Sequence, residues 1–542
     1  MVISTVSSLP SQLSLASAVL GVTSHWAYFI HGDRNTQSFV FFIVLIVGPA
    51  ALAAALHGVA GVALMQALAV AAVSTGSYLA GLFASIVVYR LWLHPAAHFP
   101  GPFPARVTQL FYPYAYMRCN GQYYRLQKAW FDTYGDVVRT GPNEVIVADP
   151  SVLPHLAKAA KGAWYSIGQS NPSVHSVRDV RTHSIRRRVW DRAFTPAAIA
   201  GCVATVQRYR ERLLQALASG ERGETNITAC VSHFAFDTMG RLTYGRDFGM
   251  LEKQGRDGSD YFLRMTHASM RVVGLLGHVP WLLVLLERLG AAGKDHMRFL
   301  KWCDEMTEER RRRGMVGGVR DLFQVLLEAE DGNKHPHHVP LRGDSRTAIV
   351  AGSDTTASTL ITLFTYLADS PEALKELQQD LDSIPEDSTD SRLLNACIDE
   401  ALRLNPPVPS GVSRTSPPEG IALDNGTFIP GGIDVLFPLW ASSHDPRWFD
   451  SPDEFRPHRW LDSSPEELAK MKAVFHPFWL GRYGCAGKPL AMVQLRDVAA
   501  AVVRRFEFSL VGSVEEAFDR CVDTFTVEMG EVRCVFKGRE RA

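Results

Sequence analysis

The segment around Cys485 carries the most distinctive chemistry of the chain. Gly481, Gly484 and Gly487 lie within seven residues around this cysteine, and an apolar helix is predicted to follow from residue 488. Glycines let a loop approach a flat ligand closely, and backbone N–H groups at a helix start stabilise a thiolate. The pattern predicts an axial metal ligand, although a buried structural cysteine in a glycine turn fits the same residues.

A second candidate lies in an otherwise apolar predicted helix, where Asp354 and Thr355 stand within the run from Ala351 to Thr356. Gly, Ser, Asp and Thr are poor helix formers, so a local distortion is expected there. A buried acid beside a hydroxyl can deliver protons. The alternative is a helix kink in which Thr355 bonds to its own backbone.

Two further groups of charged residues have an ordinary interpretation on their own. Glu400 and Arg403 are three residues apart on a predicted helix that ends at Pro406, which is the spacing of a surface salt bridge. His183 and Arg187 are four residues apart in the densest basic helix of the chain, where a solvated face is the default.

Taken together, these motifs resemble those of the cytochrome P450 superfamily, whose loop pattern is Phe-x-x-Gly-x-Arg-x-Cys-x-Gly. Phe478, Gly481, Cys485 and Gly487 match this pattern. The resemblance implies that Cys485 is the axial sulfur ligand of a haem iron.

The match departs from the family at one position of the loop. Tyr483 stands where the family has an arginine that helps to hold a haem propionate, and Arg482 lies one residue earlier. Either Tyr483 hydrogen-bonds the propionate in its place, or Arg482 swings in.

The resemblance also assigns roles to the other motifs. Asp354 and Thr355 match the proton relay of the family's oxygen-binding helix. Glu400 and Arg403 match its Glu-x-x-Arg motif, which Arg459 completes, and this cluster is expected to support the haem loop without taking part in the reaction.

Three basic residues are implied as propionate partners by the same resemblance. They are His183 and Arg187, on the helix expected to cross the haem, and Arg414, at a position where the family usually carries a basic residue. The remaining arginines of the basic helix can face an acidic electron-donor protein.

The first 95 residues are predicted to form a membrane anchor. No Asp, Glu, Lys or Arg occurs from Asn35 to Tyr89, and a bilayer core takes about 20 apolar residues per helix. Spans are predicted near 39–56 and 62–88, with a third over 13–30 as an open alternative. The apolar region is too long for a cleaved signal peptide, and Arg90 follows it.

The rest of the chain is predicted to be one large domain of the α+β class, mainly α. A proline-rich hinge over 96–104 precedes a catalytic domain over 105–542. Helical periodicity predicts helices at 124–134, 203–218, 261–273, 299–313 and 371–381. Strands are predicted at 136–139, 144–148, 433–437, 508–511 and 532–536. The resemblance implies the cytochrome P450 fold, a triangular helical domain with small β-sheets.

The amino-acid composition limits the kinds of molecule that the protein is expected to bind. The 56 basic residues equal the 56 acidic ones, which gives no reason to expect nucleic acid. Eight cysteines without a CxxC pair fit a reducing compartment. The sequence has no glycine-rich Rossmann loop and no flavin segment, so electrons from NADPH must come through a separate protein.

The resemblance implies a haem b monooxygenase that inserts one oxygen atom from O2 into a lipophilic small molecule. Its implied partners are NADPH-dependent cytochrome P450 reductase, cytochrome b5 as an optional second donor, and membrane lipid. The anchor looks like that of fungal secondary-metabolism enzymes, which suggests a polyketide, terpenoid or alkaloid substrate. The expected location is the endoplasmic reticulum membrane with the catalytic domain facing the cytosol. A haem-thiolate isomerase or dehydratase that does not use O2 is the alternative.

Overall fold

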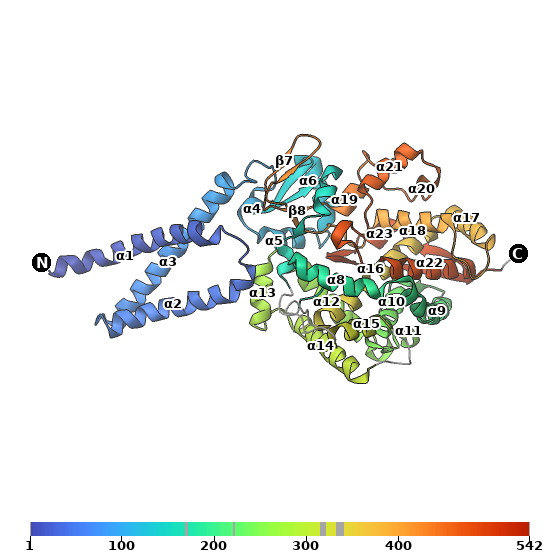
Figure 1. Cartoon of the computed structure of the whole chain (residues 1–542), viewed down its shortest axis with the longest axis horizontal. Coiled ribbons are helices and arrows are strands. Elements are labelled where there is room, and N and C mark those ends of the chain that lie inside the picture. The colour runs from blue at the N-terminus through green and yellow to red at the C-terminus, as the bar shows by residue number, and fades with distance from the viewer. Residues whose placement is uncertain (1, 168–171, 220–222, 315–320, 332–340, 541–542) are drawn as a thin grey trace.

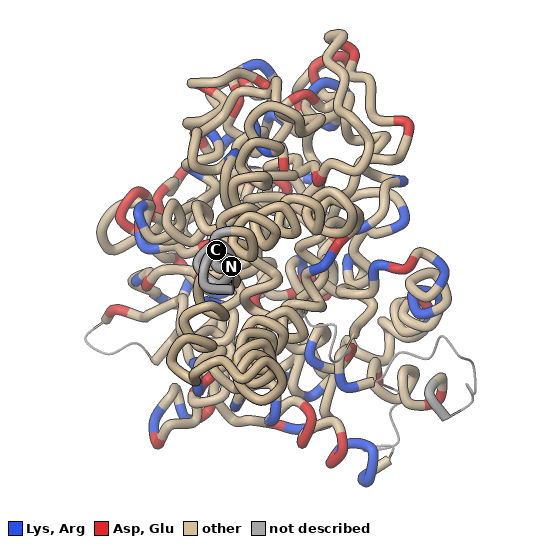
Figure 2. The backbone as a smooth tube through the Cα atoms, turned by 90° about the vertical axis from the view of Figure 1, so that its left-hand side faces the viewer, with Lys and Arg blue, Asp and Glu red and all other residues tan. Residues whose placement is uncertain are grey.

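Three long apolar helices form one end of the molecule in the computed structural model, which describes residues 2–167, 172–219, 223–314, 321–331 and 341–540. They are α1 (Val2–Ser24), α2 (Ser38–Gly58) and α3 (Leu64–Val88), and they extend away from the rest of the chain (Figure 1). Residues 35–58 and 64–93 form two helices that are long and apolar enough to cross a membrane. Seen from this end, the helices carry no charge, and the charged residues lie around them on the catalytic body (Figure 2).

Helix α1 packs along α3 in parallel orientation. Ser14 Oγ lies 2.6 Å from Ser77 Oγ, and His25 Nδ1 lies 2.8 Å from Ser85 Oγ at the other end of the pair. Small residues permit this close packing, since a Cβ on Gly81 would lie 2.2 Å from the carbonyl oxygen of Ala18. Residues 2–24 are thus helical, and the helix ends at Ser24, where the next five residues, His25–Phe29, widen into a π-helical turn. The third span over 13–30 stays a prediction, because only 35–58 and 64–93 among the described helices have the length and apolarity of a span.

The segment predicted to be a hinge is docked onto the first strand. The Arg139 N–H donates to Pro100 O at 2.7 Å, and a Cβ on Gly101 would lie 2.2 Å from Arg139 O. Helix α4 (Phe103–Val107) already begins inside the predicted range 96–104, because proline is well accommodated in the first turn of a helix. The connection between anchor and body is thus fixed by contacts.

A second contact joins the anchor to the body. In the loop between α1 and α2, Asp33 Oδ2 accepts a hydrogen bond from Ser166 Oγ at 2.9 Å and pairs with Arg178. The adjoining turn, Asn35–Gln37, packs against helix α13 (Pro280–Arg288). The α1–α2 loop therefore contacts the main body of the chain.

The body is mainly helical, as predicted, and its core surrounds α16 (Leu341–Asp369). This helix is buried along most of its length because apolar residues and small hydroxyl residues occupy all of its faces. It packs against α10, α18 and α22. The other helices are α5 (Phe111–Arg118), α6 (Tyr123–Tyr134), α7 (Leu153–Leu156), α8 (Val180–Ala193), α9 (Pro196–Ala218), α10 (Ile227–Tyr244), α11 (Met250–Lys253), α12 (Tyr261–Leu276), α14 (Lys294–Arg313), α15 (Leu322–Asp331), α17 (Pro371–Asp382), α18 (Arg392–Leu404), α19 (Leu439–Ser443), α20 (Arg459–Asp462), α21 (Pro465–Val474), α22 (Lys488–Arg505) and α23 (Val514–Phe518).

Small sheets lie at the edges of the helical body. The largest has the strand order β1-β2-β8-β5-β3, made of β1 (Val137–Gly141), β2 (Glu144–Val147), β8 (Asp434–Leu436), β5 (Arg414–Thr415) and β3 (Ala160–Lys161). The predicted hairpin of the first two strands is confirmed. The predicted strands near the C-terminus pair with each other, as β9 (Phe506–Val511) and β12 (Arg533–Gly538), beside β4 (Thr225–Asn226). Two further hairpins are β6 (Ile421–Ala422) with β7 (Phe428–Ile429), and β10 (Val522–Thr524) with β11 (Thr526–Glu528).

The packing of α1 on α3 can be tested by crosslinking. With Ser14→Cys and Ser77→Cys combined, we expect an oxidised crosslink in the membrane-embedded protein, because the two side chains touch. Gly81→Leu should abolish the crosslink, because its side chain has no space against Ala18. Gly76→Leu is the matched control, since a Cβ at that glycine meets nothing within 4 Å. A crosslink that survives Gly81→Leu would contradict this helix packing.

Candidate functional site

One cavity of about 280 Å³ lies between α16, the Cys485 loop, α8 and the sheet strands β3 and β5. Its wall is largely apolar toward α16 and basic toward the sheet. The basic and hydroxyl-bearing end is lined by Lys161, Tyr165, His175, His183, Arg187, Arg414, Trp479 and Tyr483. Apolar lining elsewhere includes Val174, Phe194, Ala348, Ala351, Leu402, Val408, Val412, Phe478, Leu490 and Phe525.

The Cys485 side chain faces this cavity. The Cys485 N–H donates to Phe478 O at 2.9 Å, which closes the loop, and the next helix, α22, begins at Lys488. Gly481 has φ of +67° and packs so closely that a Cβ would lie 2.4 Å from Ala157 O, so glycine is required there. This predicted residue shapes the loop but does not line the cavity.

The electrostatics of the Cys485 thiol are set by opposing effects. Burial raises its pKa, whereas the backbone N–H groups of Gly487 and Lys488 and the charge of Arg187 lower it. The part of the thiol that is exposed points into the cavity. Burial dominates, so the net shift of the Cys485 pKa is upward. A cation bound in the cavity would add to the stabilisation of the negative sulfur that the helix-start N–H groups provide only in part.

Thr355 lines the cavity from α16, and Asp354 does not. The helix continues without a break through this segment, so the expected distortion is absent. The side-chain hydroxyls of Ser353 and Thr355 donate to the carbonyl oxygens of Ile349 and Ala351, at 2.7 and 2.6 Å. Such bonding to the preceding turn lets the hydroxyl residues remain in the helix.

Asp354 is buried behind the cavity wall, where it meets a short chain of polar groups. Its carboxylate accepts from Thr526 Oγ1 at 3.5 Å and lies 3.7 Å from His267 Nε2. His267 Nδ1 in turn lies 3.6 Å from Glu528, whose carboxylate holds the exposed Arg271 through two bonds of 2.7 Å. Burial lowers the pKa of His267, but the carboxylates of Asp354 and Glu528 outweigh it, so the net shift is upward.

The basic end of the cavity brings together the three residues predicted as propionate partners. Arg414 stacks over the Tyr483 ring at 4.8 Å and donates to Tyr165 Oη at 3.1 Å. His183 meets the same ring edge-on at 4.6 Å, and Arg187 donates to Gly484 O. Burial and the nearby cations lower the pKa of His183 to about 3.

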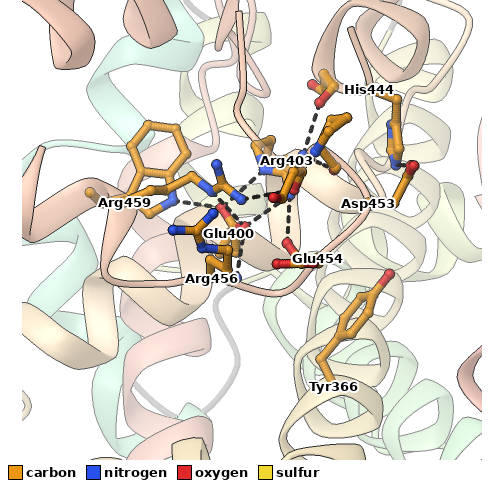
Figure 3. Close-up of polar contacts among 12 residues, drawn as sticks. Tyr366, Glu400, Arg403, His444, Asp453, Glu454, Arg456 and Arg459 are labelled. Carbon is orange, nitrogen blue, oxygen red and sulfur yellow. Dashed lines mark hydrogen bonds and ion pairs between the residues drawn. The ribbon is translucent and has the colours of Figure 1, made fainter. Parts of the chain in front are cut away.

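A separate buried cluster forms around Glu400, as predicted (Figure 3). Its carboxylate accepts from Arg403 at 2.8 and 3.0 Å, from Arg459 at 3.0 Å, from the Trp460 indole at 2.9 Å and from the Arg456 N–H at 3.0 Å. The remaining N–H groups of Arg403 donate to the carbonyl oxygens of Ser443, Pro452 and Glu454. The cluster lies outside the cavity lining.

Comparison with known proteins identifies the family to which these motifs belong. The family model for cytochrome P450 matches residues 128–522. The chain belongs to the cytochrome P450 family. It is 33% identical to the cytochrome P450 monooxygenase FCK2 of Fusarium pseudograminearum, over 96% of this chain and 97% of the relative. It is 36% identical to the monooxygenase orf5 of Eupenicillium brefeldianum, over 86% and 96% of the two chains.

A third relative comes from Neosartorya fischeri and is named tryprostatin B 6-hydroxylase; it is 33% identical over 80% of each chain. These names confirm the predicted branch, the monooxygenases of fungal secondary metabolism. They support oxygenation and not the isomerase or dehydratase alternative. The chain is thus a cytochrome P450 monooxygenase.

The residues of the cavity fit the haem that this P450 family carries. Four buried polar atoms at the basic end have no hydrogen-bond partner within the described part of the chain: His183 Nδ1, Arg414 Nε, Trp479 Nε1 and Tyr483 Oη. Buried polar groups are normally paired, so this group marks the place of an external acceptor. The two carboxylates of a haem would meet these atoms, and its iron would meet Cys485.

Sequence reasoning missed three residues of this P450 cavity. Lys161, His175 and Trp479 all line the basic end. Lys161 lies on a strand of two residues, Ala160–Lys161, which is too short to show a hydrophobic alternation. Trp479 occupies a position at which the loop motif accepts any residue. Nothing in the sequence pointed to Lys161 or His175 as cavity residues.

The Glu400 cluster generates a stability prediction. Glu400→Ala should lower the free energy of unfolding by about 3–5 kcal/mol, because two buried guanidinium groups lose their counter-charge. Thermal or denaturant unfolding of the full chain measures the change. Glu466→Ala, on the exposed first turn of α21, is the control and should change stability by no more than about 0.5 kcal/mol. Equal effects of the two substitutions would show that the cluster does not hold the fold.

Proposed function

We propose that this cytochrome P450 binds haem b through Cys485 and inserts one oxygen atom from O2 into a lipophilic small molecule. The observation that carries the proposal is the arrangement of one cavity, with a thiol on its wall and unpaired cationic and polar groups at one end. When bound, the haem supplies dioxygen activation, which a thiolate ligand favours by donating electron density. His183, Arg187 and Arg414 would hold its carboxylates.

Protons for the reaction would enter through the residues behind α16. Asp354 lies between the cavity hydroxyl of Thr526 and the imidazole of His267, and Glu528 continues the chain to Arg271 at the surface. His267 exchanges a proton between the two carboxylates, and Asp354 passes it toward the cavity. Thr355, whose hydroxyl group stands on the cavity wall, orients the last donor.

The apolar lining of the cavity favours a lipophilic substrate. Its lining includes Ala351, Val408, Val412 and Phe525. The fungal relatives, one of them named a tryprostatin B hydroxylase, support a secondary metabolite as the substrate class. Few charged groups face this part of the wall, so shape and apolar contact would select the substrate.

Electrons would come from NADPH through a separate cytochrome P450 reductase, with cytochrome b5 as an optional donor. Arg181, Arg188 and Arg192 project from α8 into solvent, beside the end of the cavity that His183 and Arg187 line. An exposed cationic face at this place suits an acidic donor protein.

The anchor would place the enzyme in the endoplasmic reticulum membrane with residues 105–542 in the cytosol. Three spans, α1 to α3, put the N-terminus on the opposite side from the catalytic body, and the loop at Asp33 on the same side. Arg90 at the end of α3 fits the positive-inside rule. The α1–α3 crosslink tests the parallel packing that this topology requires.

The carbon monoxide difference spectrum of the reduced, membrane-extracted protein tests the ligand assignment. We expect a strongly red-shifted Soret band in the wild type, because a thiolate donates electron density to the iron. Cys485→Ser should abolish this band while haem remains bound. A haem-loaded wild type without the band, or a serine variant that keeps it, would mean that Cys485 is not the ligand.

Thr355→Ala tests the proton route. The ratio of oxygenated product to NADPH consumed should fall by up to roughly 100-fold, with hydrogen peroxide formed instead, because proton delivery becomes misdirected. Thr365→Ala is the matched control: this threonine lies on the same helix and bonds Ile361 O at 2.7 Å, but does not line the cavity. Coupling that is unchanged in Thr355→Ala would refute its role.

A further inference from the structure

A second, smaller cavity lies beside the one that Cys485 lines, and we call it the side chamber. Its volume is about 20 Å³, which holds one group of the size of a water molecule. Phe525 lines both cavities and therefore stands between them. The polar residues that line the side chamber are Tyr112, His278, Ser410, Ser413 and Asp523.

Asp523 brings a buried carboxylate to this chamber. Its two oxygens accept hydrogen bonds from the Ser410 hydroxyl and, at 3.1 Å, from the Phe525 N–H. Burial raises the pKa of Asp523, and the Ser410 hydroxyl, the Phe525 N–H and the charge of His278 only partly offset it. Within the described part of the chain, no lysine or arginine forms an ion pair with Asp523. A buried carboxylate in this situation is stabilised by a cation.

His278 does not supply that cation in full, because it already has a carboxylate of its own. Its Nδ1 lies 3.0 Å from Glu144 Oε2. Burial lowers the pKa of His278, but the Glu144 carboxylate outweighs it, so the net shift is upward. The two side chains therefore form an ion pair without net charge, and the charge of Asp523 remains unbalanced.

A further polar group in the side chamber lacks a partner. The Ser413 side chain is buried, and its Oγ has no hydrogen-bond partner among the described residues. Tyr112 Oη donates to Gly274 O at 2.9 Å, which leaves its oxygen as an acceptor. Buried polar groups are normally paired, so the chamber has places for a ligand that donates hydrogen bonds.

Phe525, between the two cavities, is held in an uncommon backbone conformation. Its φ is +83°, in the left-handed region that side chains other than glycine rarely adopt. The bond from its N–H to Asp523 and the stacking of its ring on Trp164, with centroids 4.5 Å apart, fix this conformation. Strained residues of this kind are typical of ligand-binding sites.

We propose that the side chamber binds a protonated amine of the substrate, with the Asp523 carboxylate as its counter-charge. The ammonium donates to Asp523, and the Ser413 and Tyr112 oxygens accept its other N–H groups. The rest of the substrate extends past Phe525 into the cavity that Cys485 lines. The inference rests on the proposed function, and it narrows the substrate to a lipophilic compound that carries a basic nitrogen away from the oxidised position.

Two soluble probes that differ in a single group test this proposal. Tryptamine carries an ammonium where tryptophol carries a hydroxyl, and both are small and apolar elsewhere. Their dissociation constants are measured by equilibrium dialysis on the reduced, carbon monoxide-bound, full-length protein, in which the amine has no access to the iron. We expect the wild type to prefer tryptamine by roughly 10- to 100-fold, the value of a charge-assisted hydrogen bond.

Asp523→Asn should reduce this preference to a few-fold or less, because it removes the charge and keeps the shape. Asp519→Asn is the matched control: this acid is exposed, lines neither cavity, and should leave the preference unchanged. Val273→Phe is a second test that changes no charge. Val273 is half-buried and lines the side chamber, so the larger ring should fill the chamber and remove the preference.

The proposal would be overturned if the wild type bound tryptamine no more tightly than tryptophol. It would equally be overturned if Asp523→Asn kept the preference, and where that variant does not load haem, Val273→Phe decides in the same way. A failure of the proposed haem site is distinguishable from these results, because it appears in the wild type as the absence of the red-shifted carbon monoxide band.

Discussion

A single buried carboxylate, that of Glu400, fixes the part of the fold on which the Cys485 loop rests. It has no contact with water, so its charge must be met by donors, and five hydrogen bonds meet it. The five bonds come from four residues: Arg403 on α18, and Arg456, Arg459 and Trp460 more than 50 residues later. One of them, Trp460, packs its ring at 4.6 Å against Phe475, three residues before Phe478. Through these contacts, Glu400 on α18 helps to fix the position of the Cys485 loop.

Two groups of buried cations among the described residues, around Glu400 and at the end of the cavity, differ in how they are neutralised. Around Glu400 the guanidinium groups find all their acceptors within the chain, so the cluster is complete as folded. At the end of the cavity, Lys161 and Arg414 face a space without a carboxylate, whereas Arg187 is already paired with Asp191. The Glu400 cluster stabilises the fold. The end of the cavity has cations without an acidic partner there, and the carboxylates of a haem would pair with them. The same residue types therefore serve structure in one place and cofactor binding in the other.

The chemistry of the site could largely be predicted from sequence because it lies in short motifs. The Cys485 loop, the pair Asp354 and Thr355, and the spacing of Glu400 and Arg403 each express a local constraint, such as a glycine turn or one helix face. The lining of one cavity includes Cys485, Phe478, Gly487, Thr355, His183, Arg187 and Arg414, whereas Asp354 and Gly481 lie outside it. Long apolar spans and strongly amphipathic helices were predictable for the same local reason.

What could not be predicted depends on pairing between distant segments. Lys161 enters the cavity only because a two-residue strand pairs with Arg414, and His267 meets Asp354 only because the fold brings these side chains of α12 and α16 together. Neither contact leaves a trace in sequence spacing. The expected distortion at Asp354 was wrong because hydroxyl side chains bond the helix's own carbonyl oxygens, which propensity alone does not reveal.

The contact of Asp33 with Ser166 and Arg178 changes the mechanical relation between the enzyme and its membrane. A body tied to a bilayer by one segment can swivel, whereas one tied at a chain connection and at a second loop cannot turn about that connection. Arg178 also donates to Lys161 O at 3.3 Å, so the same tie braces the strand that borders the cavity. The α1–α2 loop thus braces the active site, and an enzyme shortened by its first 40 residues would lose the Asp33 contacts while it keeps α3 and most of α2.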